Sequence, residues 1–232
     1  MSGFSDIHQH CIYGLDDGAK SFEDMTAMLR TAYADGVRNI IATPHAIPGA
    51  EPFAYSLLLQ RLREAQEYCA QEGLALRLYP GAEIMYTPAA AAMVADGKIP
   101  TLANSQNVLV EFMPDATYQT IEKGVHAFVR NGYTPILAHI ERYRCLMMKI
   151  KKARQLKEAF PVAFQVNCST IVSSKGFVIS RAMDSLLKDQ LIDYVATDAH
   201  NCTSRPSKMR SAYQMLVEKV GDEYAQELMG MK

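Results

Sequence analysis

The residues with the clearest potential for chemistry in this sequence are histidines and acids that follow short apolar runs. Nine of them share this placement: His8, His10, Asp17, His45, Glu83, Glu111, His139, Asp198 and His200. Mixed imidazole and carboxylate ligands suit divalent zinc, manganese or iron better than calcium or magnesium. Because one ion takes about four to six ligands, the nine predict two or three ions, with Glu83 as a bridge. Two ions roughly 3.5–4 Å apart favour hydrolysis of phosphate esters.

Two pairs among these residues are spaced by two positions. His8 and His10 follow the first apolar run, and Asp198 and His200 follow the last. Alternate residues of a strand point to the same face, so the members of each pair can contact one ion together. One such pair alone is often structural, for example an N-cap beside a surface histidine. Two pairs that each close an apolar run indicate a metal site.

Four further candidates follow the intervening runs singly. Pro44 removes a backbone donor, so we expect it to end a strand and to place His45 in a loop above the sheet. Glu111 comes directly after three aliphatic residues, where a carboxylate is costly to bury unless it is paired or bound to a cation. Glu83 and His139 end two other runs. All four are therefore expected near the same metal site.

Two arginines complete the candidate site. Arg142 lies three residues after His139, and Arg205 lies five residues after His200. A guanidinium at either place can hold a phosphoryl group through paired donors, although a surface salt bridge is the alternative for each. The sixth histidine, His126, falls within an expected helix and is left out of the site.

The order of the elements explains how these distant residues meet. The apolar runs lie near 4–8, 37–42, 76–80, 107–112, 135–140, 162–167 and 193–197. Helices are expected at about 21–36, 53–72, 88–95, 118–131, 147–159, 181–190, 206–219 and 221–229. Several runs are continuous rather than alternating, which is typical of strands buried on both faces. Strands that alternate with helices predict a parallel sheet, and active sites are assembled at the carboxyl-terminal edge of such sheets.

No linker or change of composition divides the chain, so residues 1–232 are expected to form a single domain. A closed or distorted α/β barrel and an open doubly wound sheet both fit the pattern. No G-x-G-x-x-G string follows the first run, so a dinucleotide-binding function has no support.

The composition excludes several other classes of protein. With 49% hydrophobic residues and a net charge of −1, the chain resembles neither a disordered protein nor a nucleic-acid binder that neutralises phosphates. No apolar run approaches the roughly 18 residues of a membrane helix, and no secretory signal is recognised, so we expect a cytoplasmic location without a transmembrane segment. None of the five cysteines begins the Cys-x5-Arg pattern, which excludes the cysteine-based phosphatase mechanism.

Several strings of residues resemble the PHP (polymerase and histidinol phosphatase) superfamily. The strings, which cover nearly the whole chain in order, are DIHQH at 6–10, GLDDGAKS at 14–21, TPH at 43–45, GAEI at 81–84, AHIERY at 138–143, QVN at 165–167 and TDAHN at 197–201. The DDGAKS and AHIERY strings resemble one branch in particular, the bacterial tyrosine-protein phosphatases of capsular and exopolysaccharide operons. The segments 46–53 and 144–148 depart from the usual family pattern, and both flank the candidate site.

The resemblance implies an α/β fold, a distorted seven-stranded (β/α)7 barrel of the TIM type, around a trinuclear centre that is often manganese-dependent. Iron and zinc are alternatives to manganese. By this resemblance His8, His10, Glu83 and Asp198 hold one ion, Glu83, Glu111 and His139 hold a second, and Asp17, His45 and His200 hold a third. Arg142 and Arg205 would bind the substrate phosphate. The implied partner is a polysaccharide-synthesis tyrosine kinase with a phosphorylated, tyrosine-rich tail, and an oligomer is compatible with the sequence.

We therefore expect a protein-tyrosine phosphatase in which a metal-activated hydroxide attacks phosphorus. One alternative keeps the metal site but takes a small phosphomonoester similar to histidinol phosphate, or a phosphodiester. A nuclease needs a basic groove, and the one dense basic run, residues 149–154, is interpreted as a solvated helix face. A non-catalytic regulatory protein is the third alternative. It predicts lost ligands, whereas all nine positions are filled.

Overall fold

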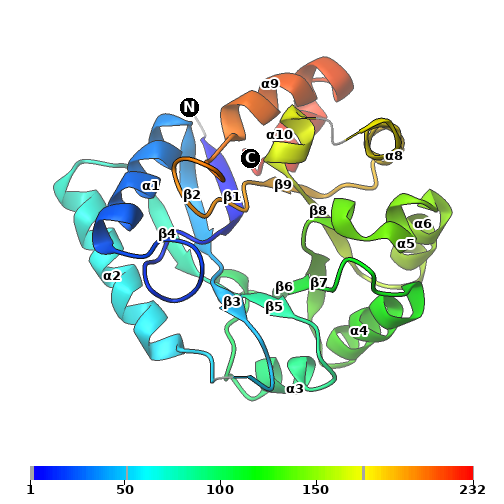
Figure 1. Ribbon diagram of the computed structural model, residues 1–232, viewed down its shortest axis with the longest axis horizontal. Helices are drawn as coiled ribbons and strands as arrows, with labels where there is room; N and C mark the ends of the chain where they lie inside the picture. Colours follow the sequence, from blue (N-terminus) through cyan, green and yellow to red (C-terminus); the bar gives the residue numbers. More distant parts are fainter. Residues whose placement is uncertain (1–2, 51, 174–175, 232) are drawn as a thin grey trace.

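Parallel strands with helices around their outside form the framework of the protein (Figure 1). The computed structural model describes residues 3–50, 52–173 and 176–231, so the ends of the expected 1–232 domain and position 51 of the segment 46–53 lie outside the described residues. The strands are β1 (Phe4–Gln9), β2 (Val37–Ala42), β3 (His45–Ala46), β4 (Arg77–Pro80), β5 (Glu83–Met85), β6 (Asn107–Glu111), β7 (Thr134–Leu137), β8 (Ala163–Asn167) and β9 (Tyr194–Ala196). The α-helices are α1 (Phe22–Ala34), α2 (Tyr55–Gln71), α3 (Ala90–Ala95), α4 (Tyr118–Arg130), α5 (Arg144–Met147), α6 (Ile150–Ala159), α7 (Cys168–Val172), α8 (Phe177–Lys188), α9 (Met209–Val220) and α10 (Asp222–Leu228), with 3-10 helices η1 (Leu102–Asn104) and η2 (Ile140–Arg142).

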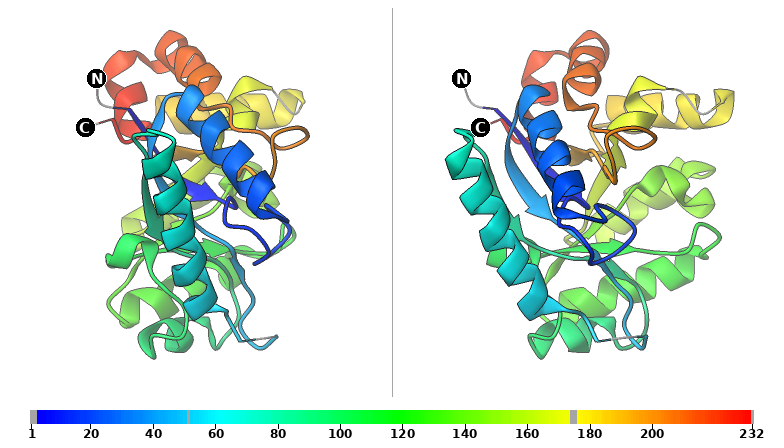
Figure 2. Two further views of the ribbon diagram at one scale, coloured as in Figure 1. Left: turned by 90° about the vertical axis from the view of Figure 1, so that its left-hand side faces the viewer. Right: turned by 60° about the vertical axis from the view of Figure 1, so that its left-hand side comes forward.

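The strands form two sheets whose named pairs are all parallel. The smaller sheet has the order β1-β2-β4, and the larger has the order β3-β5-β6-β7-β8-β9. They meet where a parallel bridge joins Gln9, at the end of β1, to Ala199, shortly after β9. Helices α1 and α2 run side by side on the outer face of the smaller sheet (Figure 2). The expected parallel α/β architecture is therefore confirmed.

Each of the seven expected apolar runs contains a strand, and the two additional strands, β3 and β5, are very short. β3 corrects one expectation, because His45 lies in a strand rather than in a loop. Pro44 does follow the end of β2, but the chain remains extended after it, and His45 pairs with Glu83 of β5. A proline with its fixed φ is compatible with extended backbone and interrupts only the ladder of hydrogen bonds.

Among the boundaries that differ from the expected ones, two lie close to the candidate site. The strand expected at 135–140 ends at Leu137, because His139 adopts a left-handed conformation with φ of 32° and η2 follows it. The helix expected at 147–159 is interrupted at Met148, where α5 ends before α6 begins. Both changes bend the chain close to the candidate site.

Two apolar clusters hold the sheets and helices together. The larger cluster fills the space between the sheets and the α-helices, and Leu29 of α1 and Leu58 of α2 are fully buried in it. The smaller cluster is built around Leu102, Leu109 and Ile136 and contains no α-helical residue. Neighbouring residues of β6 alternate between the clusters, so both faces of this strand are covered, as its continuous apolar run predicted.

The two ends of the described chain lie next to each other (Figure 2). The Ser5 amide donates to the carbonyl oxygen of Met229 at 2.9 Å, which fastens β1 to the segment after α10. Within the described residues, no helix is both long enough and apolar enough to cross a membrane.

Candidate metal centre

The nine predicted side chains come together at the carboxyl-terminal edge of the strands. Each comes from a strand end or from the segment that follows it: β1 for His8, His10 and Asp17, β3 for His45, β5 for Glu83, β6 for Glu111, β7 for His139, and β9 for Asp198 and His200. The ligand atoms fall into three sets, and within each set they lie no more than 4.8 Å from one another: first His8, His10, Glu83 and Asp198; second His45, Glu83 and Glu111; and third His10, Asp17, His45 and His200. Parallel strands bring such positions to one edge, which explains the convergence.

The first set is fully buried. The Nε2 atoms of His8 and His10 lie 3.2 Å apart. The Oε2 atom of Glu83 lies 3.2 Å and 3.3 Å from these two nitrogens, and Asp198 Oδ1 lies 3.5 Å from each. Two nitrogens and two oxygens thus surround a common point, which is how ligands are arranged around an ion.

Glu83 connects the first set with the second. Its Oε1 atom lies 2.7 Å from His139 Nε2, which is also 3.4 Å from Glu111 Oε1. Its Oε2 atom lies 3.1 Å from Nδ1 of His45, and this nitrogen is 4.0 Å from Glu111 Oε2. The resemblance implied His139 as the histidine beside Glu83 and Glu111, whereas the set within 4.8 Å contains His45; both rings contact the two acids. The two oxygens of Glu83 face different histidines, as a bridging carboxylate requires.

The third set opens toward solvent. Asp17 Oδ1 lies 3.3 Å from His45 Nε2 and 3.3 Å from His200 Nε2, and the Asp17 side chain is 61% exposed. His10 adds its ring to this set, stacked 3.9 Å from the ring of His200 between centroids. This is therefore the side from which a substrate can approach.

The charges of the cluster depend on one another. Burial alone would raise the pKa of Glu83, but the charge of His8 and the hydrogen bonds from His10 and His139 lower this pKa well below its ordinary value. Burial opposes protonation of His139, yet its hydrogen bonds to Glu111 and Glu83 raise its pKa to about 9. The pKa of Asp198 is lowered because the charge of His8 and a hydrogen bond from His10 outweigh burial. In the ion-free protein, protonated imidazoles thus supply the positive charge that the carboxylates need.

The donor set fits divalent ions. His200 Nε2, which lies 3.3 Å from Asp17 Oδ1, is a buried nitrogen that forms no hydrogen bond among the described residues. Three imidazole nitrogens, those of His8, His10 and His45, lie within 3.3 Å of the single oxygen Oε2 of Glu83. Buried polar groups that lack partners are costly, and a bound cation would satisfy several of these lone pairs at once.

Both predicted arginines lie at the mouth of the cluster and contact the same carboxylate. Arg142 Nη2 donates to Asp198 Oδ2 at 2.7 Å, and Arg205 Nη2 donates to Asp198 Oδ1 at 2.8 Å. Their side chains are 36% and 39% exposed. Two guanidinium groups that remain accessible beside a cluster of acids provide donors for an anion that enters from solvent.

A second layer of polar residues, which the sequence analysis missed, orients the histidines. Asp16 Oδ2 lies 2.7 Å from His10 Nδ1 and accepts the backbone N–H of His45 at 3.0 Å. Burial opposes ionisation of Asp16, but hydrogen bonds from His10, Gly18 and His45 lower its pKa to about 2. Metal-binding histidines commonly contact a carboxylate through their other nitrogen. The adjacent acids of the DDG string were the available signal, but only the second had been selected.

Gln165 and Asn167 of β8 form the other part of this layer. Gln165 Oε1 lies 3.1 Å from His8 Nδ1 and accepts the His139 N–H at 2.7 Å. Gln165 Nε2 donates to Asn167 Oδ1, and Asn167 Nδ2 donates to Asp198 Oδ2 at 2.8 Å. Since alternate residues of a strand share a face, the QVN spacing could have indicated two side chains directed at one site.

Backbone conformation also aims two of the predicted ligands. His139 and Asp198 have φ values of 32° and 51°, in the left-handed region that residues other than glycine rarely adopt. The same-face argument from strand alternation therefore does not describe the pair Asp198 and His200. Such strain is concentrated at functional sites. His126, which had been left out of the site, is exposed and packs against Phe160.

Comparison with known proteins identifies the family of this chain. The sequence model of the family described as "Capsular polysaccharide synthesis, CpsB/CapC" matches residues 4–231. Tyrosine-protein phosphatase CpsB of Streptococcus pneumoniae is 33% identical over 96% of this chain and 93% of its own length. Tyrosine-protein phosphatase YwqE of Bacillus subtilis is 28% identical over 94% of this chain and 85% of its own length.

A structural similarity supports the same relationship. A chain from the crystal structures of YwqE and CpsB, described as unique metal-dependent tyrosine phosphatases, superposes with a TM-score of 0.87 at 28% identity, covering 97% of this chain and 91% of that chain. The phosphotriesterase homology protein of Escherichia coli, with a TM-score of 0.58 and 14% identity, shares the fold alone. The resemblance to the capsular phosphatase branch is confirmed, and the chain belongs to the CpsB/CapC family of capsular polysaccharide synthesis proteins.

Proposed function

We propose that this protein is a metal-dependent protein-tyrosine phosphatase. The observation that carries the proposal is the convergence of nine imidazole and carboxylate side chains at one sheet edge, with two accessible arginines beside them. The relatives named as tyrosine-protein phosphatases, which match nearly the whole chain, support the same activity. The buried set of His8, His10, Glu83 and Asp198 would not stabilise the fold better than apolar side chains of similar size, which favours a functional role.

The nine side chains would hold two or three divalent ions, with Glu83 shared between neighbouring ions. We propose manganese, with iron or zinc as alternatives, because imidazole and carboxylate donors suit these metals. When bound, such ions lower the pKa of water and thereby provide the nucleophile for attack on phosphorus. Asp16, Gln165 and Asn167 hold the ligands in place through the hydrogen bonds described above.

Arg142 and Arg205 would bind the non-bridging oxygens of the phosphoryl group. The two guanidinium groups donate to different oxygens of Asp198 and therefore flank this carboxylate. A phosphate bound beside Asp198 would receive donors from both arginines. The tyrosinate leaving group has a pKa near 10, so it needs less protonation than an alkoxide. Cys11 and Cys168 are not suited to the alternative route, because burial raises the pKa of their thiols far above the ordinary value.

Four finer points belong to the same proposal. We propose a phosphorylated bacterial tyrosine kinase with a tyrosine-rich tail as the substrate protein, and a cytoplasmic location. We propose that residues 1–232 form one domain. We also propose that β2 with β3, and β4 with β5, each act as one interrupted strand, so that the two sheets together form a distorted barrel with seven strand positions. An experimental structure with bound ions would test the last point directly.

One experiment separates this function from its alternatives. The purified protein is assayed with a phosphotyrosine peptide, histidinol phosphate and a bis-ester, each with added manganese, with a chelator and after thiol alkylation. We expect turnover of the peptide that the chelator abolishes and that alkylation leaves unchanged. Turnover that survives chelation but is lost on alkylation would overturn the mechanism. Activity confined to histidinol phosphate or to the bis-ester would contradict the proposed substrate but not the proposed metal centre.

A further inference from the structure

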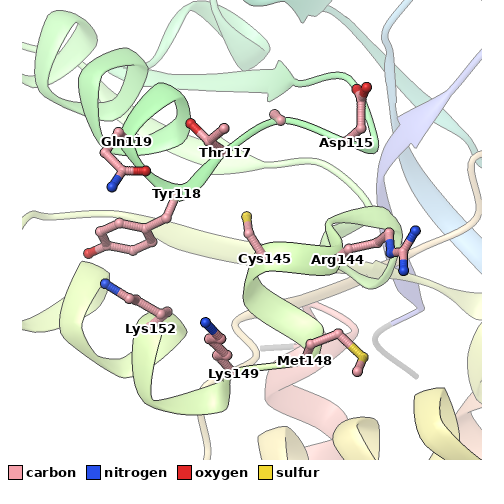
Figure 3. A pocket seen from close by; sticks show the side chains of 10 residues that line it. Asp115, Thr117, Tyr118, Gln119, Arg144, Cys145, Met148, Lys149 and Lys152 are labelled. Atoms are coloured by element: carbon pink, nitrogen blue, oxygen red, sulfur yellow. The ribbon is translucent and has the colours of Figure 1, made fainter.

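A second hollow in the protein lies close to the metal centre and is lined by none of its ligands. This cavity of about 600 Å³ has two facing walls (Figure 3). One wall is the segment from β6 to the start of α4, and the other is α5 with the start of α6. The lining residues are Asp115, Ala116, Thr117, Tyr118, Gln119, Arg144, Cys145, Met148, Lys149 and Lys152.

The charge of this cavity is positive and uncompensated. Arg144, Lys149 and Lys152 line it against the single acid Asp115, and none of the three cations forms an ion pair within the described part of the chain. Neighbouring cations behave differently, since Arg154 of the same helix α6 pairs with Asp189 at 2.8 Å. Unpaired cations gathered around a hollow favour an anionic ligand.

The cavity also offers apolar surface next to these charges. The Lys152 ammonium lies 4.2 Å from the centroid of the Tyr118 ring, and Met148, which is 62% exposed, belongs to the opposite wall (Figure 3). A lysine held over an aromatic face keeps its charge in a defined place. The combination suits a side chain with a hydrocarbon or aromatic body and a negatively charged tip.

The chain limits how far Arg144, in one wall of the cavity, can lie from Arg142 at the mouth of the metal centre. Arg144 follows the phosphate-binding candidate Arg142 by two residues, so their Cα atoms are at most about 7.6 Å apart. The residue between them, Tyr143, is fully buried and accepts the Phe112 N–H at 3.1 Å, which ties both walls to the end of β6. An extended peptide covers about 3.3–3.6 Å per residue, so two or three residues span this separation.

We infer that this cavity binds an anionic side chain of the substrate protein, located about two or three residues from the reacting phosphotyrosine. The inference rests on the proposed function and adds a preference for acidic or multiply phosphorylated sequences. It also gives a role to Lys149 and Lys152 of the basic run 149–154 and to the segment 144–148, which departs from the family pattern. A carboxylate and a second phosphotyrosine both carry the negative charge that the cavity requires. Peptides that carry one or the other distinguish between them.

The test compares three phosphotyrosine peptides that differ only in the flanking residues: alanine, glutamate, or a second phosphotyrosine. The enzyme is used with manganese, and p-nitrophenyl phosphate, which has no flank, reports the basal activity. We expect kcat/KM for the anionic peptides to exceed that of the alanine peptide about threefold to tenfold, mainly through KM, and to lose this advantage at high salt. A larger advantage for the second phosphotyrosine than for glutamate identifies phosphate as the preferred anion.

Two variants assign the effect to the cavity. The double substitution Lys149→Ala with Lys152→Ala is expected to remove the preference for anionic flanks without changing the rate on p-nitrophenyl phosphate. The matched control is Lys151→Ala, because Lys151 is exposed on the same helix but does not line the cavity. The Lys151→Ala enzyme is expected to keep the wild-type preference for anionic flanks. Equal kcat/KM for all three peptides in the wild type, or a preference that survives the double substitution, would overturn the inference. Absence of turnover of every substrate, p-nitrophenyl phosphate included, would overturn the proposed function as well.

Discussion

Two regions on the same strands have opposite characters. On β6, Leu109 lies in the smaller apolar cluster, whereas Glu111, two residues later on the same face, belongs to the candidate metal centre. The apolar cluster has side chains that stabilise the fold by burial alone. The candidate metal centre instead buries carboxylates, which repel one another unless protonated imidazoles or bound cations balance their charge. The difference indicates that one part of the sheet provides stability and its carboxyl-terminal edge provides chemistry.

The largest effect is expected from Asp198→Asn. Asp198 contacts His8, His10 and both arginines, so loss of its charge disturbs ion binding and phosphate binding together. We expect kcat/KM on a phosphotyrosine peptide to fall by roughly a thousandfold, with circular dichroism unchanged. The matched control is Asp184→Asn, an exposed acid paired with Lys219, which should retain activity. Wild-type kinetics in the first variant would remove Asp198 from the site.

Leu109→Ala tests the apolar region. Leu109 is fully buried, so its truncation leaves a cavity and should lower the free energy of unfolding by about 2–5 kcal/mol. Chemical denaturation measures this change, and activity per folded molecule should remain near wild type. A large loss of activity per folded molecule would contradict the separation between a region that stabilises the fold and a region that provides chemistry.

Arg142→Lys is expected to have a smaller effect on catalysis. A lysine keeps the charge but loses the paired donors that fit a phosphoryl group. We expect kcat/KM to fall by roughly a hundredfold, with the metal content unchanged. Arg154→Lys is the control, because Arg154 forms a similar pair with Asp189 away from the site. Equal kinetics for the two variants would contradict a role of Arg142 in binding phosphate.

The smallest effect concerns pH and the metal-free protein. The folded pKa of His139 is raised to about 9, above its unfolded value near 6.5, so its contribution to stability is complete below pH 6.5 and is lost as the pH rises through 9. The melting temperature of chelated protein should therefore decrease by a few degrees from pH 6.5 to 9. Bound ions replace the protons, so the stabilisation by manganese should grow over the same interval. A chelated protein that becomes more stable toward pH 9 would contradict this charge balance.

The sequence predicted the main strands and the set of residues that converge, because both depend on local patterns. Continuous apolar runs marked the strands, and a carboxylate such as Glu111 after three aliphatic residues marked their ends. The finer structure depends on tertiary contacts. The two-residue strand at His45 is too short for any periodicity, and it exists because Glu83 lies beside it. The left-handed backbone of His139 and Asp198 has no signal in residue type.

The supporting residues escaped prediction for a different reason. Asp16 contacts His10 from a turn six residues later in the chain, and Asn167 of β8 contacts Asp198, which follows β9. Aspartate and asparagine are common in turns and at strand ends, so residue type alone does not show that Asp16 and Asn167 orient metal ligands. Only the three-dimensional arrangement distinguishes them from ordinary loop residues. The sequence predicts a solvated face for the basic run 149–154, because helix periodicity does not reveal the opposite wall of the cavity that Lys149 and Lys152 line.

The most direct test of the central proposal is the number of metal ions per chain. The protein is purified with manganese, and the bound metal is measured by mass spectrometry for the wild type and for Glu83→Gln. Because Glu83 faces two groups of ligands, we expect two to three ions per wild-type chain and a loss of at least one in the variant. Less than one ion per wild-type chain, or an unchanged number in Glu83→Gln, would contradict the proposed polynuclear centre.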